Sequence, residues 1–455
     1  MSSTHHLRNI VSARSPRAQR GTVAIMAVLL AALIVLFFIF LTAVPVQAQT
    51  FEVLYVFQNG QDGYSPGTLV FDKRDNLYGV SLGGHREGVC APIGSCGRVF
   101  QLARRNADWF PFVLYDFIGG ADGAYPTGLI MAPDGLLYGI TQWGGHGAFC
   151  DSCGTVFRLK PSPGARSSQC CGWTETVIHT FGDRDHDGAI PEHPLVFDKA
   201  GNLYGTASDG GEFGYGVAYK LTPTNDGWTE TILHRFGATG DGVNPLSGLT
   251  MDASGNLYGT TLYGGDLSSG TIYQLSPSEN GWTEKVIYSF TGREDGWFLS
   301  AGLTLGPSGE LYGATLNGGE GGGGVVFKLI PSGDRWNFTV LYSLTSTGLY
   351  AGPHADLALD SAGNLYGTTL PAGCSPVPRQ SRNSEGCGTS EAYGTVFKLS
   401  PTKRGPWTYT LLHDFTGGYD GDTPWVGVIL GPDGKLYGSA RNGSQYYGLI
   451  YRITP

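Results

Sequence analysis

The chain has 455 residues, of which 15% are charged, and its 29 basic and 38 acidic side chains give a net charge of −9. Its 72 glycines and its 12% of aromatic residues are typical of a turn-rich, all-β protein. We expect no nucleic-acid partner, because phosphate binding requires clustered lysines and arginines and no basic run follows Arg20.

The first 48 residues are predicted to lie outside the fold. The basic residues 1–21 hold four arginines, and an uncharged apolar run over residues 22–44 leads to small residues that end at Ala48. This pattern indicates a signal peptide over residues 22–48 that is cleaved after Ala48. It equally fits an uncleaved anchor, because 23 apolar residues are long enough to cross a bilayer. In either case residues 49–455 reach the extracellular space, the cell surface or the periplasm.

The tripeptide Leu-Tyr-Gly occurs seven times in the remaining chain, and its successive copies are 60, 66, 54, 54, 54 and 71 residues apart. A unit of about fifty residues that recurs in this way cannot bury its own apolar face and needs neighbours on both sides. The repeat therefore predicts a radial array of small sheets. The repeated tyrosines are Tyr78, Tyr138, Tyr204, Tyr258, Tyr312, Tyr366 and Tyr437.

Each unit contains four predicted short strands, here called a, b, c and d in chain order. In residues 247–290, for example, four stretches of alternating apolar residues are bounded by Gly, Pro, Asn or Asp, with no helical period between them. Seven such units predict an all-β, seven-bladed β-propeller of four-stranded antiparallel blades over residues 49–455. Residues 51–57 have a d-strand pattern whereas the chain ends on a c strand. We therefore expect the N-terminal strand to pair into the last blade and close the ring.

Six of the nine tryptophans lie at or near the start of a d strand, and we expect them to pack between blades because their position follows the repeat. A second d-strand position holds His179, His234 and His413 in three units and tyrosine in the others, which argues against catalysis at this position. The six tryptophans are Trp109, Trp173, Trp228, Trp282, Trp336 and Trp407.

Three short motifs resemble those of a known family. Gly-Asn-Leu-Tyr-Gly-Thr recurs at 201–206, 255–260 and 363–368, Gly-Thr-Val-Phe begins at 154 and 394, and Gly-Trp-Thr-Glu begins at 172, 227 and 281. On these motifs residues 51–455 resemble the GloVer tandem repeats of exported bacterial proteins, which are named for their varied choice of surface anchors. The resemblance implies secreted or surface placement and a propeller-like array, and it implies no activity. A weaker likeness to NHL and gluconolactonase-type propellers extends to architecture only.

The eight cysteines all follow residue 48, and an even number outside the cytoplasm predicts disulfides. Three close pairs each fall inside one loop between strands b and c, so we expect local disulfides. They are Cys90 with Cys96, Cys150 with Cys153, and Cys374 with Cys387. For Cys170 and Cys171 the sequence leaves the pairing open, and the C-x-x-C spacing at Cys150 leaves a zinc or redox pair as the alternative.

The loops from d to a and from b to c leave a propeller on one face, and the variable insertions concentrate there, so we predict that this is the working face. Six of its seven d-to-a loops contain Asp-Gly. These aspartates either stabilise local turns or form a ring of carboxylates that attracts a cation or a polyhydroxy ligand. They are Asp62, Asp122, Asp187, Asp241, Asp295 and Asp420.

One of these loops has the D-x-D-x-D-G spacing of a calcium loop, with Asp183, Asp185 and Asp187 as the candidate metal ligands. The twelfth position is Pro194, so the bidentate glutamate of an EF-hand is missing. The loop is therefore predicted either to bind Ca²⁺ as a cofactor or to be a solvated acidic loop.

Three tryptophans lie outside the repeat pattern, and all of them fall in working-face loops: Trp143, Trp297 and Trp425. Such rings either stack on sugars or pack the loops. The sequence contains no nucleophile elbow, no zinc-protease helix and no phosphate-binding glycine loop, so we expect no catalytic residues. Five loop histidines are expected to be ordinary surface residues: His85, His146, His186, His193 and His354.

These observations predict an exported, monomeric, non-enzymatic binding module for a glycan or a surface protein. Its contact with a membrane would be limited to residues 22–44 of an uncleaved signal. Two alternatives stay open. One is a metal-assisted hydrolase, lactonase or lyase that acts on carbohydrate, and the other is a structural component of the cell envelope.

Overall fold

The computed structural model describes residues 49–58, 62–84, 95–106, 108–162, 172–345, 351–371, 393–443 and 447–455. All of them belong to the second of two compact units, Gln49–Pro455. In these ranges no helix is both long and apolar enough to cross a membrane. The predicted signal segment, residues 22–48, lies outside the described residues.

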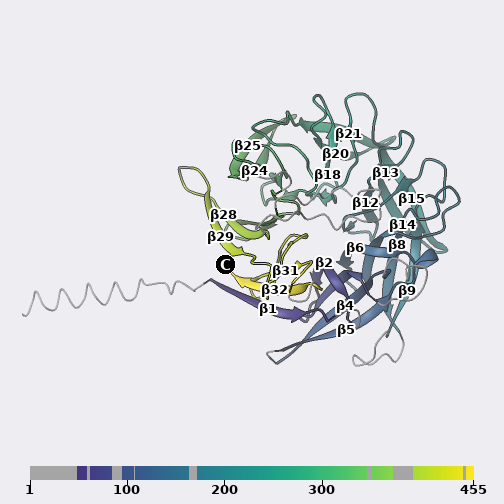
Figure 1. Cartoon of the computed structure of the whole chain (residues 1–455). Helices are drawn as coiled ribbons and strands as arrows, with labels where there is room; N and C mark the ends of the chain where they lie inside the picture. The colour runs from purple at the N-terminus through teal and green to yellow at the C-terminus, as the bar shows by residue number, and fades with distance from the viewer. Residues whose placement is uncertain are drawn as a thin grey trace, which may run out of the picture. The chain divides into compact units, whose positions relative to one another are not determined.

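The described strands form seven four-stranded antiparallel sheets, which confirms the predicted all-β, seven-bladed propeller (Figure 1). The first three blades consist of β2 (Tyr64–Phe71), β3 (Leu77–Gly83), β4 (Arg98–Arg105) and β5 (Asp108–Asp116); β6 (Ala124–Met131), β7 (Leu137–Trp143), β8 (Thr155–Pro161) and β9 (Trp173–Thr180); and β11 (Val196–Phe197), β12 (Leu203–Ala207), β14 (Val217–Thr224) and β15 (Gly227–Arg235). One short 3-10 helix, η2 (Gly120–Asp122), precedes β6.

The next three blades continue around the ring with the same order of strands. They consist of β17 (Thr250–Met251), β18 (Leu257–Thr261), β20 (Thr271–Ser278) and β21 (Gly281–Ser289); β22 (Thr304–Leu305), β23 (Leu311–Ala314), β24 (Gly322–Ser332) and β25 (Arg335–Thr345); and β26 (Ala358–Leu359), β27 (Leu365–Thr369), β28 (Thr395–Ser400) and β29 (Thr408–Asp414).

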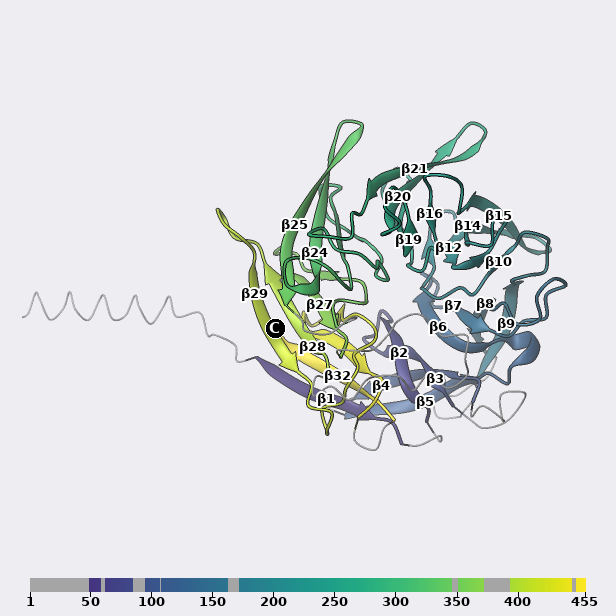
Figure 2. The ribbon, with the colours of Figure 1, turned by 45° about the horizontal axis from the view of Figure 1, so that its top comes forward.

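The seventh blade closes the ring as predicted. It combines β30 (Ile429–Leu430), β31 (Leu436–Ala440) and β32 (Leu449–Thr454) with β1 (Thr50–Val56) from the other end of the chain. β1 pairs antiparallel with β32, with Phe51 opposite Ile453. Figures 1 and 2 both show the purple β1 beside the yellow β32.

The Leu-Tyr-Gly motif forms the buried b strand of each blade, and its glycine is required by close packing. A Cβ atom on Gly259 would lie 2.3 Å from the hydroxyl oxygen of Tyr273, which belongs to the adjacent c strand. No side chain fits at that separation, because packed carbon and oxygen atoms stay above about 3 Å. The aromatic ring of strand c thus occupies the space that the glycine leaves free.

The repeated tryptophans pack between blades, which confirms their predicted role. The Trp173 ring of β9 lies 6.3 Å from the Tyr78 ring of the preceding blade, in an edge-to-face arrangement. The other five tryptophans make the same contact with the Leu-Tyr-Gly tyrosine of the blade before them, as Tyr138–Trp228, Tyr204–Trp282, Tyr258–Trp336, Tyr312–Trp407 and Tyr437–Trp109. Each such pair buries a large apolar surface at a blade boundary.

Two small sheets show that the d-to-a and b-to-c loops share one face. In the third blade β10 (Gly188–Ala189) pairs with β13 (Asp209–Gly210), and in the fourth β16 (Gly242–Val243) pairs with β19 (Tyr263–Gly264). In both cases the loop that enters the blade is hydrogen-bonded to the loop between strands b and c. The two kinds of loop therefore lie on the same face of the propeller at these blades, and a function of that face stays a prediction.

One predicted disulfide is present, between Cys150 and Cys153 in the b-to-c loop of the second blade. Cys96 is also disulfide-bonded, and Cys90, its predicted partner, lies outside the described residues. The remaining predicted pair, Cys374 with Cys387, and the open case of Cys170 and Cys171 also fall outside them.

Candidate functional site

The Asp-Gly aspartates accept hydrogen bonds from their own turns. The Asp295 carboxylate, for example, accepts bonds from the Thr291 backbone N–H at 2.8 Å and from the Tyr288 hydroxyl at 3.1 Å. Asp62 and Asp122 receive equivalent bonds from Tyr55 and Tyr115, and Asp241 and Asp420 from His234 and His413. These bonds are the ones expected if the aspartates stabilise local turns. Binding of a ligand by the aspartates stays a prediction.

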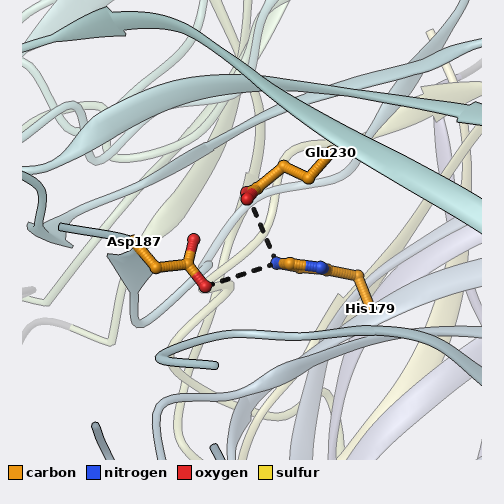
Figure 3. A group of neighbouring side chains, drawn as sticks. All are labelled: His179, Asp187 and Glu230. Atoms are coloured by element: carbon orange, nitrogen blue, oxygen red, sulfur yellow. Dashed lines mark ion pairs between the residues drawn. The ribbon is translucent and has the colours of Figure 1, made fainter. Parts of the chain in front are cut away.

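Asp187 has the same two backbone bonds as Asp241, but its loop is one residue longer and its carboxylate forms no hydrogen bond with the d-strand histidine. Its carboxylate accepts bonds from the backbone N–H groups of Gly182 and Gly188, at 2.9 and 2.7 Å. The d-strand residue that would complete the turn, His179 on β9, instead lies with Nε2 3.7 Å from Asp187 Oδ2 and 3.4 Å from Glu230 Oε1 (Figure 3). Glu230 belongs to β15, so the cluster spans the boundary between the second and third blades.

This His179–Asp187–Glu230 cluster is buried and incompletely bonded. The three side chains are 10%, 1% and 3% exposed. Neither His179 Nε2 nor Glu230 Oε1 has a hydrogen-bond partner among the residues that the structure describes. Unpaired polar atoms in a protein interior cost free energy, and that cost falls when the atoms share a proton or bind a cation.

Burial also changes the pKa values of the cluster. Loss of solvent, reinforced by the negative charge of Asp187, raises the pKa of the Glu230 carboxyl to about 8. The same loss of solvent lowers the pKa of the His179 imidazole. Both shifts favour neutral forms near pH 7, which fits a site in which one proton is held between two carboxyl groups while the imidazole is free to act as a ligand.

A related group lies at the next boundary, between the third and fourth blades. The ligand atoms of His234, Asp241 and Glu284 lie within 4.8 Å of one another, as those of the first cluster do. There, however, His234 Nε2 is 2.8 Å from Asp241 Oδ2 and forms a hydrogen bond with it. The imidazole nitrogen is therefore already occupied at the second group.

The first cluster adjoins a pocket of about 240 Å³. Asp187 and Glu230 form part of its wall, whereas the unpaired atoms Glu230 Oε1 and His179 Nε2 are buried behind it. Asp183 and Asp185 are exposed, and neither belongs to a metal-sized group among the described residues. Calcium binding by the three aspartates of this loop stays a prediction. The pocket is lined by Arg184, Asp185, His186, Asp187, Glu230, Ile232 and Arg235.

The three tryptophans outside the repeat pattern are half-buried. Trp143 packs against one core cluster, and Trp297 and Trp425 pack against another that includes Leu316. The guanidinium of Arg441 lies 3.8 Å above the centre of the Trp425 ring. Each of these rings therefore contributes to loop packing, and sugar stacking by them stays a prediction.

A second polar group was not predicted from the sequence. His354 is 6% exposed and its Nδ1 lies 3.1 Å from the backbone oxygen of Trp425, so its prediction as a surface histidine is wrong. Glu192 accepts a hydrogen bond from Gln142 at 3.2 Å, and burial raises the pKa of its carboxyl to about 8. Burial lowers the pKa of the nearby Arg441 guanidinium to about 9.

The repeat itself could have revealed this group. Gln142 and Arg441 lie four residues after the Leu-Tyr-Gly tyrosine, a position that holds leucine in four of the seven units. A polar residue at a repeat position that is otherwise leucine therefore indicates a polar group in the interior.

Comparison with solved structures finds likeness at low identity. The extracellular domain of a proposed one component system from B. thetaiotaomicron is 11% identical with a TM-score of 0.50, over 88% of this chain and 39% of that domain. A proposed glucose dehydrogenase from Thermus thermophilus is 15% identical, with a TM-score of 0.42 over 90% and 100%. A proposed 6-phosphogluconolactonase from Bacteroides uniformis is 15% identical, with a TM-score of 0.47 over 80% and 89%. At these identities a likeness concerns the fold alone.

No curated protein has a sequence that matches this chain. A family model does match: residues 167–376 fit the Gloeobacter/Verrucomicrobia repeat. This match covers the third, fourth and fifth blades, together with β9 of the second blade and β26 and β27 of the sixth. The chain is therefore a propeller whose residues 167–376, fewer than half of the total, match the Gloeobacter/Verrucomicrobia repeat.

Proposed function

We propose that the protein is a non-enzymatic binding propeller whose ligand occupies the pocket between the second and third blades. The observation that carries this proposal is the combination of two exposed guanidinium groups, Arg184 and Arg235, with buried carboxyl groups in one concave site. Neither arginine has an ion-pair partner among the described side chains. Both are therefore available to a ligand.

The chemistry of the wall favours an acidic glycan. Guanidinium groups bind carboxylates in a planar, two-point arrangement, while Asp185 and His186 can accept hydrogen bonds from sugar hydroxyls. At about 240 Å³ the pocket is smaller than those that enclose drug-sized ligands, which start at about 300 Å³. The ligand is accordingly one sugar residue that carries a carboxylate, within a longer chain that stays outside.

The protein is further proposed to act as a monomer outside the cytoplasm. The Cys150–Cys153 disulfide supports this location, because such bonds persist in oxidising compartments. The signal-like residues 22–48 support it as well.

Thermal unfolding with and without saccharides tests this function. Polysaccharides with uronic acid residues are expected to raise the melting temperature, and neutral polysaccharides of the same size are not, because binding to the native state alone stabilises it. Arg235→Ala and Arg184→Ala should each remove the effect, whereas Trp297→Ala should keep it. Equal shifts in all variants, or none in the wild type, would contradict the proposal.

A second candidate is a metal-assisted hydrolase or lactonase for carbohydrate. It is favoured by the His179–Asp187–Glu230 cluster, two members of which line the pocket, because a metal held by these residues would supply Lewis-acid chemistry beside a bound sugar. Release of sugar acid or of a cleaved glycan in the presence of a divalent metal would support it. Binding without turnover supports the first candidate.

A further inference from the structure

We propose that His179, Asp187 and Glu230 bind one divalent transition-metal ion of the zinc class, with an open coordination position toward the pocket. The inference goes beyond the proposed function, because the arginines alone suffice to hold an acidic sugar. The metal site and the glycan site can therefore be tested independently, and the failure of one leaves the other in place.

The distances within the cluster fit a metal better than hydrogen bonds. Ligand atoms that lie about 2.0–2.2 Å from a tetrahedral ion are roughly 3.3–3.6 Å from one another. His179 Nε2 lies 3.4 Å from Glu230 Oε1 and 3.7 Å from Asp187 Oδ2. Hydrogen bonds between nitrogen and oxygen are shorter, at about 2.7–3.2 Å. The two distances from His179 Nε2 are thus at or near the spacing of a coordination shell, and all three ligand atoms lie within 4.8 Å of one another.

Two of the ligand atoms lack any other partner. Glu230 Oε1 and His179 Nε2 are buried and form no hydrogen bond with the residues that the structure describes. The hydroxyl of Tyr219 is buried and likewise forms no hydrogen bond with the described residues. Asp187 is held in place by the N–H groups of Gly182 and Gly188. A bound cation would complete the bonding of this group.

The types of ligand select the metal. One imidazole nitrogen with two carboxylates is a donor set that suits zinc and its neighbours, whereas calcium prefers six to eight oxygen ligands. Asp183 and Asp185, which would supply further oxygens for calcium, are exposed and lie outside the group. Three protein ligands would leave a tetrahedral ion one free position, which we expect on the side of the pocket because Asp187 and Glu230 also line it.

The neighbouring boundary explains why we expect one ion per chain. His234, Asp241 and Glu284 are the same residue types in the same strand positions. The His234 nitrogen is hydrogen-bonded to Asp241 at 2.8 Å, and that group does not line the pocket. It provides a matched control within the same molecule.

Zinc titration of chelator-treated protein by calorimetry, without saccharide, tests the site. The wild type should bind one Zn²⁺, and Glu230→Gln and His179→Gln should bind it at least a hundred-fold more weakly. Glu284→Gln should match the wild type. Cobalt should bind with the visible absorption of a low-coordinate site, and that absorption should disappear in Glu230→Gln. Failure of the wild type to bind, binding that survives both substitutions, or binding of calcium in place of zinc would overturn the proposal.

Folding of the variants is controlled by their melting temperatures without metal. Glutamine resembles a protonated glutamate, so Glu230→Gln should fold like the wild type and decides the question even if His179→Gln is unstable. Zinc should raise the melting temperature of the wild type and of Arg235→Ala, but not that of Glu230→Gln. Arg235→Ala separates the two sites, because it should lose saccharide binding and keep the metal.

Discussion

Six of the seven boundaries between blades divide into a polar half and an aromatic half, although they use the same two strand positions. At the boundaries around the second and third blades, Glu175, Glu230 and Glu284 face Tyr115, His179 and His234 of the preceding blade. On the opposite side the facing pairs are stacked rings: Tyr288–Phe338, Tyr342–Tyr409 and His413–Phe51. Stacked rings stabilise, whereas buried carboxyl groups cost stability, so the polar half is the part of the ring in which we propose the binding site.

The largest loss of stability is expected when a stacked ring is removed at the closure of the propeller. The Phe51 ring lies 3.7 Å from the His413 ring and 5.4 Å from that of Tyr451. Phe51→Ala is expected to lower the free energy of unfolding by about 2–4 kcal/mol, because Phe51 is partly buried and holds β1 in the last blade. Urea unfolding measures the loss. Phe110→Ala, at a ring that is 41% exposed on β5, should change little, and equal losses in both would contradict the role of Phe51.

A carboxylate placed in the aromatic half would test whether the stacked rings stabilise that part of the propeller. Phe338→Glu would place a carboxylate opposite Tyr288, whose hydroxyl already donates a hydrogen bond to Asp295. The arrangement would then resemble that of the polar half, where Glu175 lies opposite Tyr115 and Asp122. We expect a loss of about 2–3 kcal/mol at pH 8, from the lost stack and the buried charge. Phe338→Leu should cost less at that pH. If Phe338→Glu were more stable than Phe338→Leu, the stacked rings of the aromatic half would not be the stabilising element that we propose.

The pH dependence of the polar half follows from its raised pKa values. Burial, with the charge of Asp122, raises the pKa of Glu175 from 4.5 to about 7. The folded protein thus binds this proton more tightly than the unfolded chain, so the contribution is present below pH 4.5 and is lost as the pH rises through about 7. Glu175→Gln should therefore exceed the wild type in stability by about 1–2 kcal/mol at pH 8, after a discount for partial exposure, and match it at pH 4.

Chemical denaturation at the two pH values provides that measurement. Glu279→Gln, at an exposed position, should follow the wild type at both. A Glu175→Gln variant that is less stable than the wild type at pH 8 would show that the carboxylate has a partner in the folded protein.

The smallest effect is expected at the acidic loop. Asp185 is 71% exposed by its side chain, so Asp185→Ala should change stability by less than about 0.5 kcal/mol. It should also leave zinc binding by the neighbouring cluster unchanged. A melting temperature that rises with Ca²⁺ in the wild type and not in this variant would instead support the calcium loop.

The fold could be predicted from the sequence because each part of the repeat has one structural role. Leu-Tyr-Gly fixes the buried b strand, and the d-strand pattern of residues 51–57 indicates the closure. Both signals lie within one unit or at the chain ends, so no knowledge of blade packing is needed to find them.

The candidate site could be predicted only in part. The acidic loop indicates Asp187, but tyrosine occupies the position of His179 in other units, and Glu230 belongs to a Trp-Thr-Glu motif that is repeated elsewhere. Neither of these two residues is marked as functional by the sequence. Facing contacts across a boundary depend on how one blade packs on the next, and loop length decides whether a turn closes. The extra residue between His179 and Asp187 opens the turn that is closed at His234 and Asp241.

The proposed metal site in the polar half can be tested by anomalous X-ray diffraction at the zinc absorption edge, with crystals of the protein grown in the presence of zinc. The structure predicts one strong anomalous peak, about 2 Å from His179 Nε2, Asp187 Oδ2 and Glu230 Oε1. A peak at His234, Asp241 and Glu284 instead, or a site between the second and third blades without any peak, would contradict it.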